Sequence, residues 1–259
     1  MLLADSHCHI LDPRLAERAS DIATRLNGDG LAFVVEISAS TQESPQSLAF
    51  ANTHDNVYCT LGVHPHMVHL YTDEFERWAL TQRSKKIVAI GECGLDYFHM
   101  PHPKELQRDI FVRQIKLADK MKLPLVIHTR DAFEDMLQTL VENGRHLNNG
   151  ILFHCFSEGA EQVELVLKHF DAYFAFGGAV TYKNNKISDG AIAAVPLDRI
   201  LVETDAPYLA PEAIGGRKVL NEPKHVYHVA AHISKVRALP LEQVAAATLA
   251  NTKRFFRIL

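Results

Sequence analysis

The sequence "KIVAI" (86–90) is followed by "KELQRDIFVRQIKLADKMK" (104–122) and then by "PLVIH" (124–128), and this stretch decides the fold. The long middle segment carries apolar residues at helical spacing between Leu106 and Ala118, which predicts an amphipathic helix. The two short runs are apolar throughout, as is typical of parallel strands buried on both faces. The stretch therefore predicts a strand, helix and strand joined by a right-handed crossover.

The same alternation continues along the whole chain. The other short apolar runs are "LLA" (2–4), "AFVVEI" (32–37), "VYCTL" (57–61), "GILFH" (150–154), "AYFAF" (172–176) and "RILVE" (199–203). Helical spacing recurs between runs at 73–84, 132–143 and 158–170. Eight such units in 259 residues match a TIM barrel, so we expect an α/β fold with a single (β/α)8 barrel domain over residues 1–259.

An open doubly wound sheet is the alternative fold. It is less favoured because no Gly-x-Gly-x-x-Gly turn follows any of the apolar runs. At the end of the chain, residues 240–259 predict one closing helix, or two short ones, packed on the outside of the barrel.

Composition limits the classes of function. The net charge is -4, whereas a general polyanion binder would present a strongly basic domain, so any contact with nucleic acid must be local. The four cysteines are widely spaced and no basic and apolar leader precedes the first run, so we expect reduced thiols and a cytoplasmic protein. The apolar runs are too short to span a bilayer, so we expect no membrane partner.

Residues of metal-binding type follow the predicted strands. The chain has 15 histidines, and the polar residues at strand ends are His7, His9, His64, His66, Glu92, His128, Arg130, His154, Glu203 and Asp205. Because the carboxyl ends of parallel barrel strands form one rim, these side chains should converge there. A lone histidine at a strand end is more often a hydrogen-bonded rim residue than a ligand, so the inference of a metal site depends on their joint occurrence.

The spacing of His7 and His9 strengthens a metal-binding interpretation. Residues two apart in an extended chain point the same way, so both imidazoles can bind one ion while Cys8 points into the core. Glu92 follows a buried strand, where a carboxylate is costly unless a cation pairs with it; a salt-bridged glutamate is the alternative. Asp205 invites the same argument, and its alternative is a turn aspartate before a proline.

Imidazole and carboxylate ligands together suit zinc, manganese or iron better than calcium. Six candidate ligands exceed the needs of one tetrahedral ion, which suggests two divalent ions that share one carboxylate. Such a pair would activate a water for hydrolysis. A serine hydrolase is a weaker alternative, because the chain has no Gly-x-Ser-x-Gly turn.

Basic and aromatic residues near the same rim are candidates for binding the substrate. A phosphate-bearing substrate would suit the basic residues of the later loops, which are Arg130, Lys183, Lys186, Arg217, Lys218 and Lys224. Solvated loop charges are an equal alternative for Lys186 and Lys218. Arg130 is the strongest candidate, since its two-residue offset from His128 directs both toward the site. The aromatic residues that could stack bases, or only anchor loops, are Tyr97, Phe98, Tyr182 and Tyr208.

A series of short motifs runs along the chain in a recognisable order: "DSHCH", "GVHPH", "GECGLDYF", "VIHTRDA", "HCFS", "FAFGGAVTYKN", "ETDAPYL" and "NEP". From Asp5 to about Phe256, these motifs resemble the TatD family of metal-dependent DNases within the amidohydrolase-like TIM barrels. The resemblance implies a hydrolase of DNA phosphodiesters with two divalent ions, from among Mg, Mn, Zn and Fe. It also implies a 3′-to-5′ exonuclease on single-stranded DNA, and we expect a monomer with no obligate protein partner.

The resemblance also implies roles for individual residues. One ion would be held by His7, His9, Glu92 and Asp205, and the second by Glu92, His128 and His154. Asp205 would also accept a proton from the attacking water. His64 and Glu203 would stand beside the site as further catalytic or supporting groups, and Asp5 would support the ligands. Two departures from the family pattern bear on substrate choice, namely Glu158 after "HCFS" and the longer "EAIGGRKVLNEP" (212–223).

Two other functions stay open from the sequence. The same metal centre could hydrolyse another ester, such as that of a D-aminoacyl-tRNA, a small lactone or a small phosphoester. The barrel could also be a binding protein of DNA metabolism that has lost catalysis, although the complete set of candidate ligands weighs against this.

Overall fold

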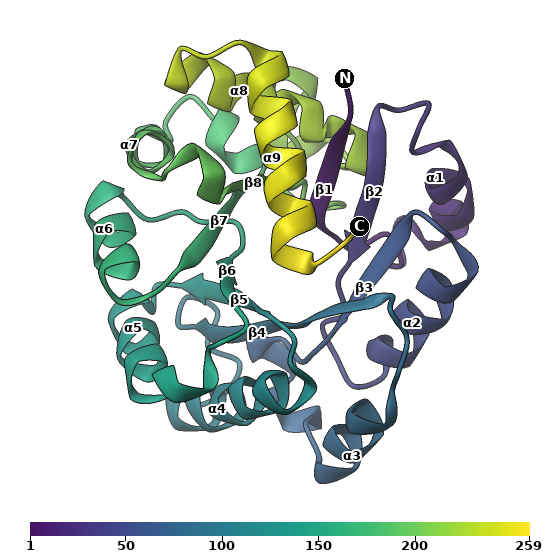
Figure 1. The fold of residues 1–259 in the computed structure, drawn as a ribbon, viewed down its shortest axis with the longest axis vertical. Helices are drawn as coiled ribbons and strands as arrows, with labels where there is room; N and C mark the ends of the chain where they lie inside the picture. Colours follow the sequence, from purple (N-terminus) through teal and green to yellow (C-terminus); the bar gives the residue numbers. More distant parts are fainter.

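The computed structural model describes residues 1–259 as an eight-stranded parallel barrel with helices around it (Figure 1). The strands pair in chain order, and each predicted apolar run forms one of them. They are β1 (Leu3–Cys8), β2 (Leu31–Glu36), β3 (Val57–Leu61), β4 (Ile87–Asp96), β5 (Leu125–Arg130), β6 (Ile151–Phe153), β7 (Ala172–Phe176) and β8 (Ile200–Val202). The predicted TIM barrel is therefore confirmed.

The barrel closes where β1 meets the segment that follows β8. There the N–H of Asp205 donates to the carbonyl of His7 at 2.9 Å, and the N–H of His9 donates to the carbonyl of Ala206 at 2.7 Å. The closure therefore places two candidate ligand segments, from opposite ends of the chain, side by side.

Nine α-helices surround or cover the barrel. They are α1 (Ala19–Arg25), α2 (Glu43–Thr53), α3 (Asp73–Thr81), α4 (Lys104–Met121), α5 (Phe133–Glu142), α6 (Ala160–His169), α7 (Lys186–Ala194), α8 (Val226–Arg237) and α9 (Leu241–Phe256). Short 3₁₀ helices occur in several loops, among them η2 (Pro65–Leu70) after β3. Even the longest helix, α4, is amphipathic, and the helices lack the combination of length and apolarity that crossing a bilayer requires.

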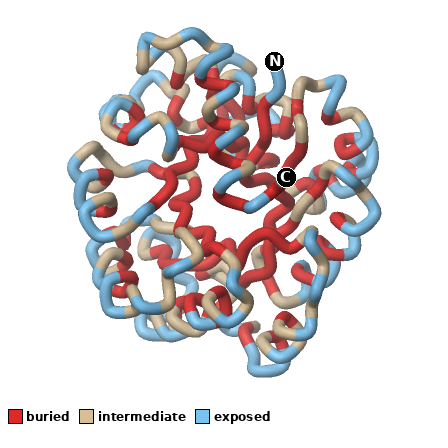
Figure 2. The backbone as a smooth tube through the Cα atoms, viewed as in Figure 1, coloured by how far each residue is buried: buried red, intermediate tan, exposed pale blue.

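Alternate residues of the strands belong to two separate apolar clusters. On β5, Leu125 and Ile127 pack with the helices in the larger cluster, while Val126 belongs to a smaller cluster inside the barrel. Figure 2 shows the strands buried and the outer faces of the helices exposed. This burial on both faces is why the strand sequences are apolar throughout instead of alternating.

The end of the chain differs from the expectation that it packs on the outside. It forms one helix, α9, which passes across one end of the barrel in Figure 1. Its last residues, Phe255 and Phe256, together with Ile258, are buried in the inner cluster. Large apolar side chains there cover barrel residues that would otherwise face water at the end opposite the candidate site.

The pairing of the strands shifts register at four points, and two of these shifts hold a candidate ligand. Asp5 pairs with Val34 and Cys8 with Glu36, so three steps along β1 match two along β2. Ile90 and Cys93 on β4 show the same mismatch against β5. Such irregularities redirect side chains locally.

The shifts place His7 and Glu92 within their strands, whereas the sequence pattern had placed them after the strands. Beside Glu92, Gly91 has φ +142°, and a Cβ there would lie 2.5 Å from the Val126 carbonyl oxygen. Only glycine allows β4 to approach β5 this closely at that point.

Candidate metal centre

The candidate residues converge on one pocket of about 720 Å³ at the carboxyl ends of the strands. Side chains from six different strands or the loops after them line it, namely His9, His64, Glu92, His128, Arg130, His154 and Asp205. His7 lies fully buried against these residues. This is the end of the barrel where the parallel strands were predicted to bring the candidate ligands together.

Glu92 lies at the centre of the group, and its two carboxylate oxygens face different histidines. Oε2 is 3.4 Å from Nε2 of His7 and 3.8 Å from Nε2 of His9. Oε1 is 2.6 Å from Nε2 of His154 and 2.7 Å from Nδ1 of His128. The carboxylate therefore lies between two sets of imidazoles, at hydrogen-bond distance from His128 and His154 and at the longer separation of two donors around one ion from His7 and His9.

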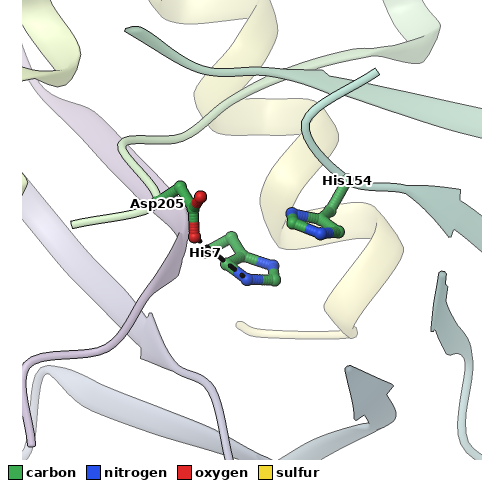
Figure 3. Close-up of side chains that lie close together, drawn as sticks. All are labelled: His7, His154 and Asp205. Atoms are coloured by element: carbon green, nitrogen blue, oxygen red, sulfur yellow. Dashed lines mark ion pairs between the residues drawn. The ribbon is translucent and has the colours of Figure 1, made fainter. Parts of the chain in front are cut away.

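Asp205 completes the set on the His7 side of Glu92. Its Oδ1 lies 3.8 Å from Nε2 of His7 and 3.4 Å from Nε2 of His9. Two donors that each lie about 2.0–2.1 Å from one ion are separated by roughly this distance. Figure 3 shows His7 next to Asp205, with His154 on the other side of His7; the two imidazoles are stacked at 3.9 Å.

The buried imidazole of His7 tests whether these residues suit a metal. Neither of its ring nitrogens has a hydrogen-bond partner within the protein, although the ring is fully buried. Buried polar atoms are nearly always paired, so two orphaned nitrogens on one ring need a partner of another kind. His9 is also oriented to bind a metal ion through Nε2. Its Nδ1 lies 3.1 Å from the Ile37 carbonyl oxygen, which fixes the ring, while Nε2 faces Asp205. This set of donors fits divalent metal ions.

The pKa values in the centre reflect its burial and its mixed charges. Burial lowers the pKa of His7 and holds that of His64 well below its ordinary value, which favours neutral rings. Burial alone would also lower the pKa of His9, but the adjacent carboxylate of Asp205 raises it to about 9. Burial would raise the pKa of Glu92, but the neighbouring His154 and other histidines hold it well below its ordinary value. A cation that binds to this centre would thus meet ionised carboxylates and would displace a proton from His9.

Glu203 and His64 stand beside the six candidate ligands. Glu203 is fully buried and does not line the pocket; its Oε1 accepts the N–H of Cys155 at 2.6 Å and lies 3.5 Å from Nδ1 of His154. His64 does line the pocket, with Nε2 3.6 Å from Oε1 of Glu92 and Nδ1 accepting the N–H of His66. Glu203 can therefore orient the His154 ring through Nδ1, on the side away from Glu92, while His64 can contact a substrate in the pocket.

Replacing Glu203 with glutamine is expected to weaken the metal site without abolishing the fold. Loss of the negative charge behind His154 should lower metal affinity and turnover by about 10–100-fold, the usual cost of removing a carboxylate that orients a metal-binding histidine. Metal content by elemental analysis and kcat on the same preparation check this. Unchanged metal affinity and kcat in a folded variant would show that Glu203 has no part in positioning His154.

Asp5 supports the centre through the backbone. Its Oδ1 accepts the N–H of Thr204 at 2.9 Å and the N–H of His7 at 3.3 Å, and Oδ2 accepts the hydroxyl of Thr204. Burial raises the pKa of Asp5 well above its ordinary value. The residue therefore ties β1 to the segment after β8 and does not touch the imidazoles. Cys8 is buried and points away, toward the carbonyl of Val35, as its alternation with the histidines predicts.

Of the basic residues predicted to bind the substrate, only Arg130 lines the pocket, and of the aromatic candidates only Tyr208 does. The Arg130 guanidinium lies 4.1 Å from the centre of the Phe98 ring. Lys183 lies exposed on the loop before α7, and Arg217 lies against Tyr182 at 5.4 Å. The other basic residues of the predicted rim are absent from the lining of this pocket, namely Lys183, Lys186, Arg217, Lys218 and Lys224. Glu158 is also absent from the lining.

Six carboxylate residues and six histidines line the pocket. The carboxylates are Asp12, Glu36, Glu43, Glu92, Asp96 and Asp205, against a single arginine and no lysine. The ionised carboxylates would repel an anionic substrate, and cations bound among them would offset that repulsion.

Sequence reasoning missed Asp96, the last residue of β4. The side chain is buried, and its Oδ2 lies 2.8 Å from Nε2 of His66, 3.0 Å from Nδ1 of His99 and 3.4 Å from Nε2 of His128. It could have been found from the motif "GECGLDYF", in which it follows Glu92 by four residues at the same end of the same strand.

The chain resembles metal-dependent hydrolases along its whole length. A family model described as TatD related DNase matches residues 4–257. The uncharacterized metal-dependent hydrolase YabD of Bacillus subtilis is 34% identical over 258 residues, which cover 99% of this chain and 100% of that protein. The 3′-5′ ssDNA/RNA exonuclease TatD of Enterobacter lignolyticus is 30% identical over 98% of each chain. The crystal structure of YJJV, a TatD homologue from Escherichia coli, matches with a TM-score of 0.90 at 30% identity, covering 99% of this chain and 98% of that one.

Proposed function

The chain belongs to the TatD-related DNase family of metal-dependent hydrolases, and from this premise we propose that it is a nuclease that removes nucleotides from the 3′ end of single-stranded DNA. The observation that carries the proposal is the position of Glu92, with one carboxylate oxygen toward His7 and His9 and the other toward His128 and His154. In this proposal, one divalent ion would be held by His7, His9, Glu92 and Asp205. A second ion would be held by Glu92, His128 and His154.

The chemistry proposed for this centre is hydrolysis of a phosphodiester. Two divalent ions held there would lower the pKa of the attacking water and neutralise charge on the scissile phosphate. Burial would raise the pKa of Asp205, but the neighbouring His9 holds it below its ordinary value, so the carboxylate is ionised. An ionised carboxylate at this position can accept the proton of the attacking water. His64, on the other side of Glu92, is placed to contact the phosphate or the leaving oxygen.

Aromatic side chains at the mouth of the pocket support a nucleic acid as the substrate. Phe98 is 58% exposed and stacks on Arg130, and Tyr208 is 44% exposed and stacks on Arg14 at 4.2 Å. Bases of a single strand can stack on exposed aromatic rings, with nearby arginines adding to the contact, whereas the bases of a duplex are already stacked on one another. The name of the relative from Enterobacter lignolyticus covers both single-stranded DNA and RNA, so both polymers belong in the test.

Incubation of the purified protein with 5′-labelled single-stranded DNA and Mg²⁺, Mn²⁺ or Zn²⁺ tests the proposal. We expect a ladder of products shortened one nucleotide at a time from the 3′ end, and protection of the same DNA when its 3′ end is blocked or paired. Matched RNA, an aminoacyl-tRNA and a small lactone serve as alternative substrates. Turnover of an ester with no cleavage of either nucleic acid would replace the proposal, and intact DNA with every metal at full metal occupancy would contradict it.

Replacing Arg130 with alanine is expected to weaken substrate binding while leaving the metal in place. The guanidinium lines the pocket and is the one arginine or lysine there that can pair with a phosphate. Its loss should raise KM by about tenfold, as expected for a hydrogen bond to a charged group. Steady-state kinetics with single-stranded DNA and metal analysis check this; loss of bound metal would instead mean that Arg130 supports the ligands.

A further inference from the structure

We propose that His66, Asp96 and His99 form a third binding site for a divalent cation, at the mouth of the same pocket. Nε2 of His66 lies 2.8 Å and Nδ1 of His99 lies 3.0 Å from Oδ2 of Asp96, and the three donor atoms lie within 4.8 Å of one another. None of these residues belongs to the ligands proposed for the binuclear centre. The inference does not depend on the identity of the substrate or on hydrolysis.

More imidazole rings face the Asp96 carboxylate than its oxygens can accept hydrogen bonds from. Oδ1 already accepts the backbone N–H groups of Phe98, at 3.0 Å, and His99, at 2.9 Å. Three imidazole nitrogens, from His66, His99 and His128, all face the remaining oxygen. A carboxylate oxygen has about two lone-pair directions, so three N–H donors cannot all be accommodated with good geometry. A cation bound between the carboxylate and the two outer rings removes this crowding, because each ring then presents a lone pair to it.

Each donor comes from a different local structure, and the fold holds them together. Asp96 ends β4, His99 lies in the turn directly after it, and His66 lies in η2 after the neighbouring strand β3. The carboxylate side chain is 1% exposed, whereas the side chains of His66 and His99 are 33% and 47% exposed. The site therefore has a buried anion at its base and a side open to the pocket, where water or a ligand can complete the coordination.

The donors indicate which metals would bind. Two imidazoles and one carboxylate favour zinc and the later first-row transition metals over Mg²⁺ or Ca²⁺, which prefer oxygen ligands. With three protein donors and partial exposure, the affinity should be lower than that of the buried centre around Glu92. Asp96 lies opposite Arg130 in the pairing of β4 with β5, and a cation bound at the site would offset the negative charge of Asp96 there. It would thus make an otherwise acidic mouth of the pocket more favourable to phosphate.

A neighbouring pair of histidines offers a matched control. His69 lies in the same 3₁₀ helix as His66, and its Nδ1 is 2.9 Å from Nε2 of His102. This pair makes no contact with a carboxylate. His102 also lies 3.1 Å from the backbone carbonyl oxygen of His66, but His69 itself contacts none of the three proposed donors. Removal of His69 therefore takes one histidine from the same surface and leaves the donor side chains of the proposed site in place.

Titration of metal-free protein with Co²⁺ or Zn²⁺, followed by calorimetry and elemental analysis, tests the proposal. Wild-type protein should bind two equivalents tightly and a third more weakly. His66→Ala and His99→Ala should each weaken the third step by about tenfold or more and keep the first two, while His69→Ala should bind as wild type. The side chain of His66 is half-buried and that of His99 is exposed, and circular dichroism verifies that both variants fold.

Several outcomes of this titration would overturn the proposal. It fails if wild-type protein binds no third equivalent, or if the third step is unchanged in both His66→Ala and His99→Ala. Glu92→Ala separates this question from the proposed nuclease centre, since it should lose the tight equivalents and keep the weaker one. If Glu92→Ala lost the weak equivalent while His66→Ala and His99→Ala kept it, that ion would belong to the binuclear centre instead.

Discussion

Replacing Glu92 with alanine is expected to abolish measurable hydrolysis and to release both tightly bound ions. Glu92 is the one residue whose oxygens face both groups of histidines, so its loss affects the two ions together. Two ions each contribute several kcal/mol to the stabilisation of transition-state charge, so the rate should fall by about 10³-fold or more. Elemental analysis and a single-turnover assay with labelled single-stranded DNA on the same sample measure both effects.

A second glutamate of the same pocket provides the control for Glu92. Glu43 also lines the pocket, but it accepts the N–H of Ala39 at 2.9 Å and contacts no histidine. Glu43→Gln should therefore retain the full metal content. If Glu92→Ala, folded by circular dichroism, kept two equivalents of metal and an undiminished rate, the assignment of Glu92 as the shared ligand would be wrong.

Replacing Asp205 with asparagine is expected to produce the second largest loss, mainly in kcat. Asparagine keeps an oxygen at the same position but loses the charge that faces His7 and His9, and it cannot accept a proton. General base catalysis typically contributes about 10²–10⁴-fold, so a fall in kcat of this size is expected beyond any change in KM. Metal affinity should fall on the His7 side only, which leaves close to one tightly bound equivalent at limiting metal.

The comparison of kcat with metal content separates the two roles of Asp205. Addition of excess metal should restore occupancy in Asp205→Asn but not the rate. Asp12→Asn removes another carboxylate from the pocket lining, where Asp12 pairs with Arg14, and should leave metal affinity unchanged. Full recovery of kcat at saturating metal would show that Asp205 serves only as a ligand and that the proton goes elsewhere.

Most of the fold follows from local sequence patterns. The eight apolar runs become the eight strands because each is buried on both faces, a pattern that depends only on the run itself. The position of α9 could not be predicted in this way. Its apolar spacing marks one buried side, but whether Phe255 and Phe256 meet the outside of the barrel or its open end depends on residues distant in sequence.

The parts of the candidate site that could be predicted are those in which spacing along a single strand determines where the side chains point. His7 and His9 face the same way because they are two residues apart, and parallel strands bring them to the same rim as His128 and His154. The register shifts at His7 and Glu92 involve pairing between strands, so spacing along one strand does not reveal them. Lys183 and Arg217 were proposed from their charge and their position after a strand, and neither is part of the pocket lining, because loop conformation does not follow from charge.

The most direct test of the binuclear centre is a titration of metal-free protein with Mn²⁺ in which bound metal and hydrolysis of single-stranded DNA are measured in the same samples. With Glu92 shared between two ions, the rate should stay near zero through the first bound equivalent and rise to its maximum as the second binds. A full rate with one ion bound, or no hydrolysis with both sites filled, would contradict a nuclease that depends on two ions bridged by Glu92.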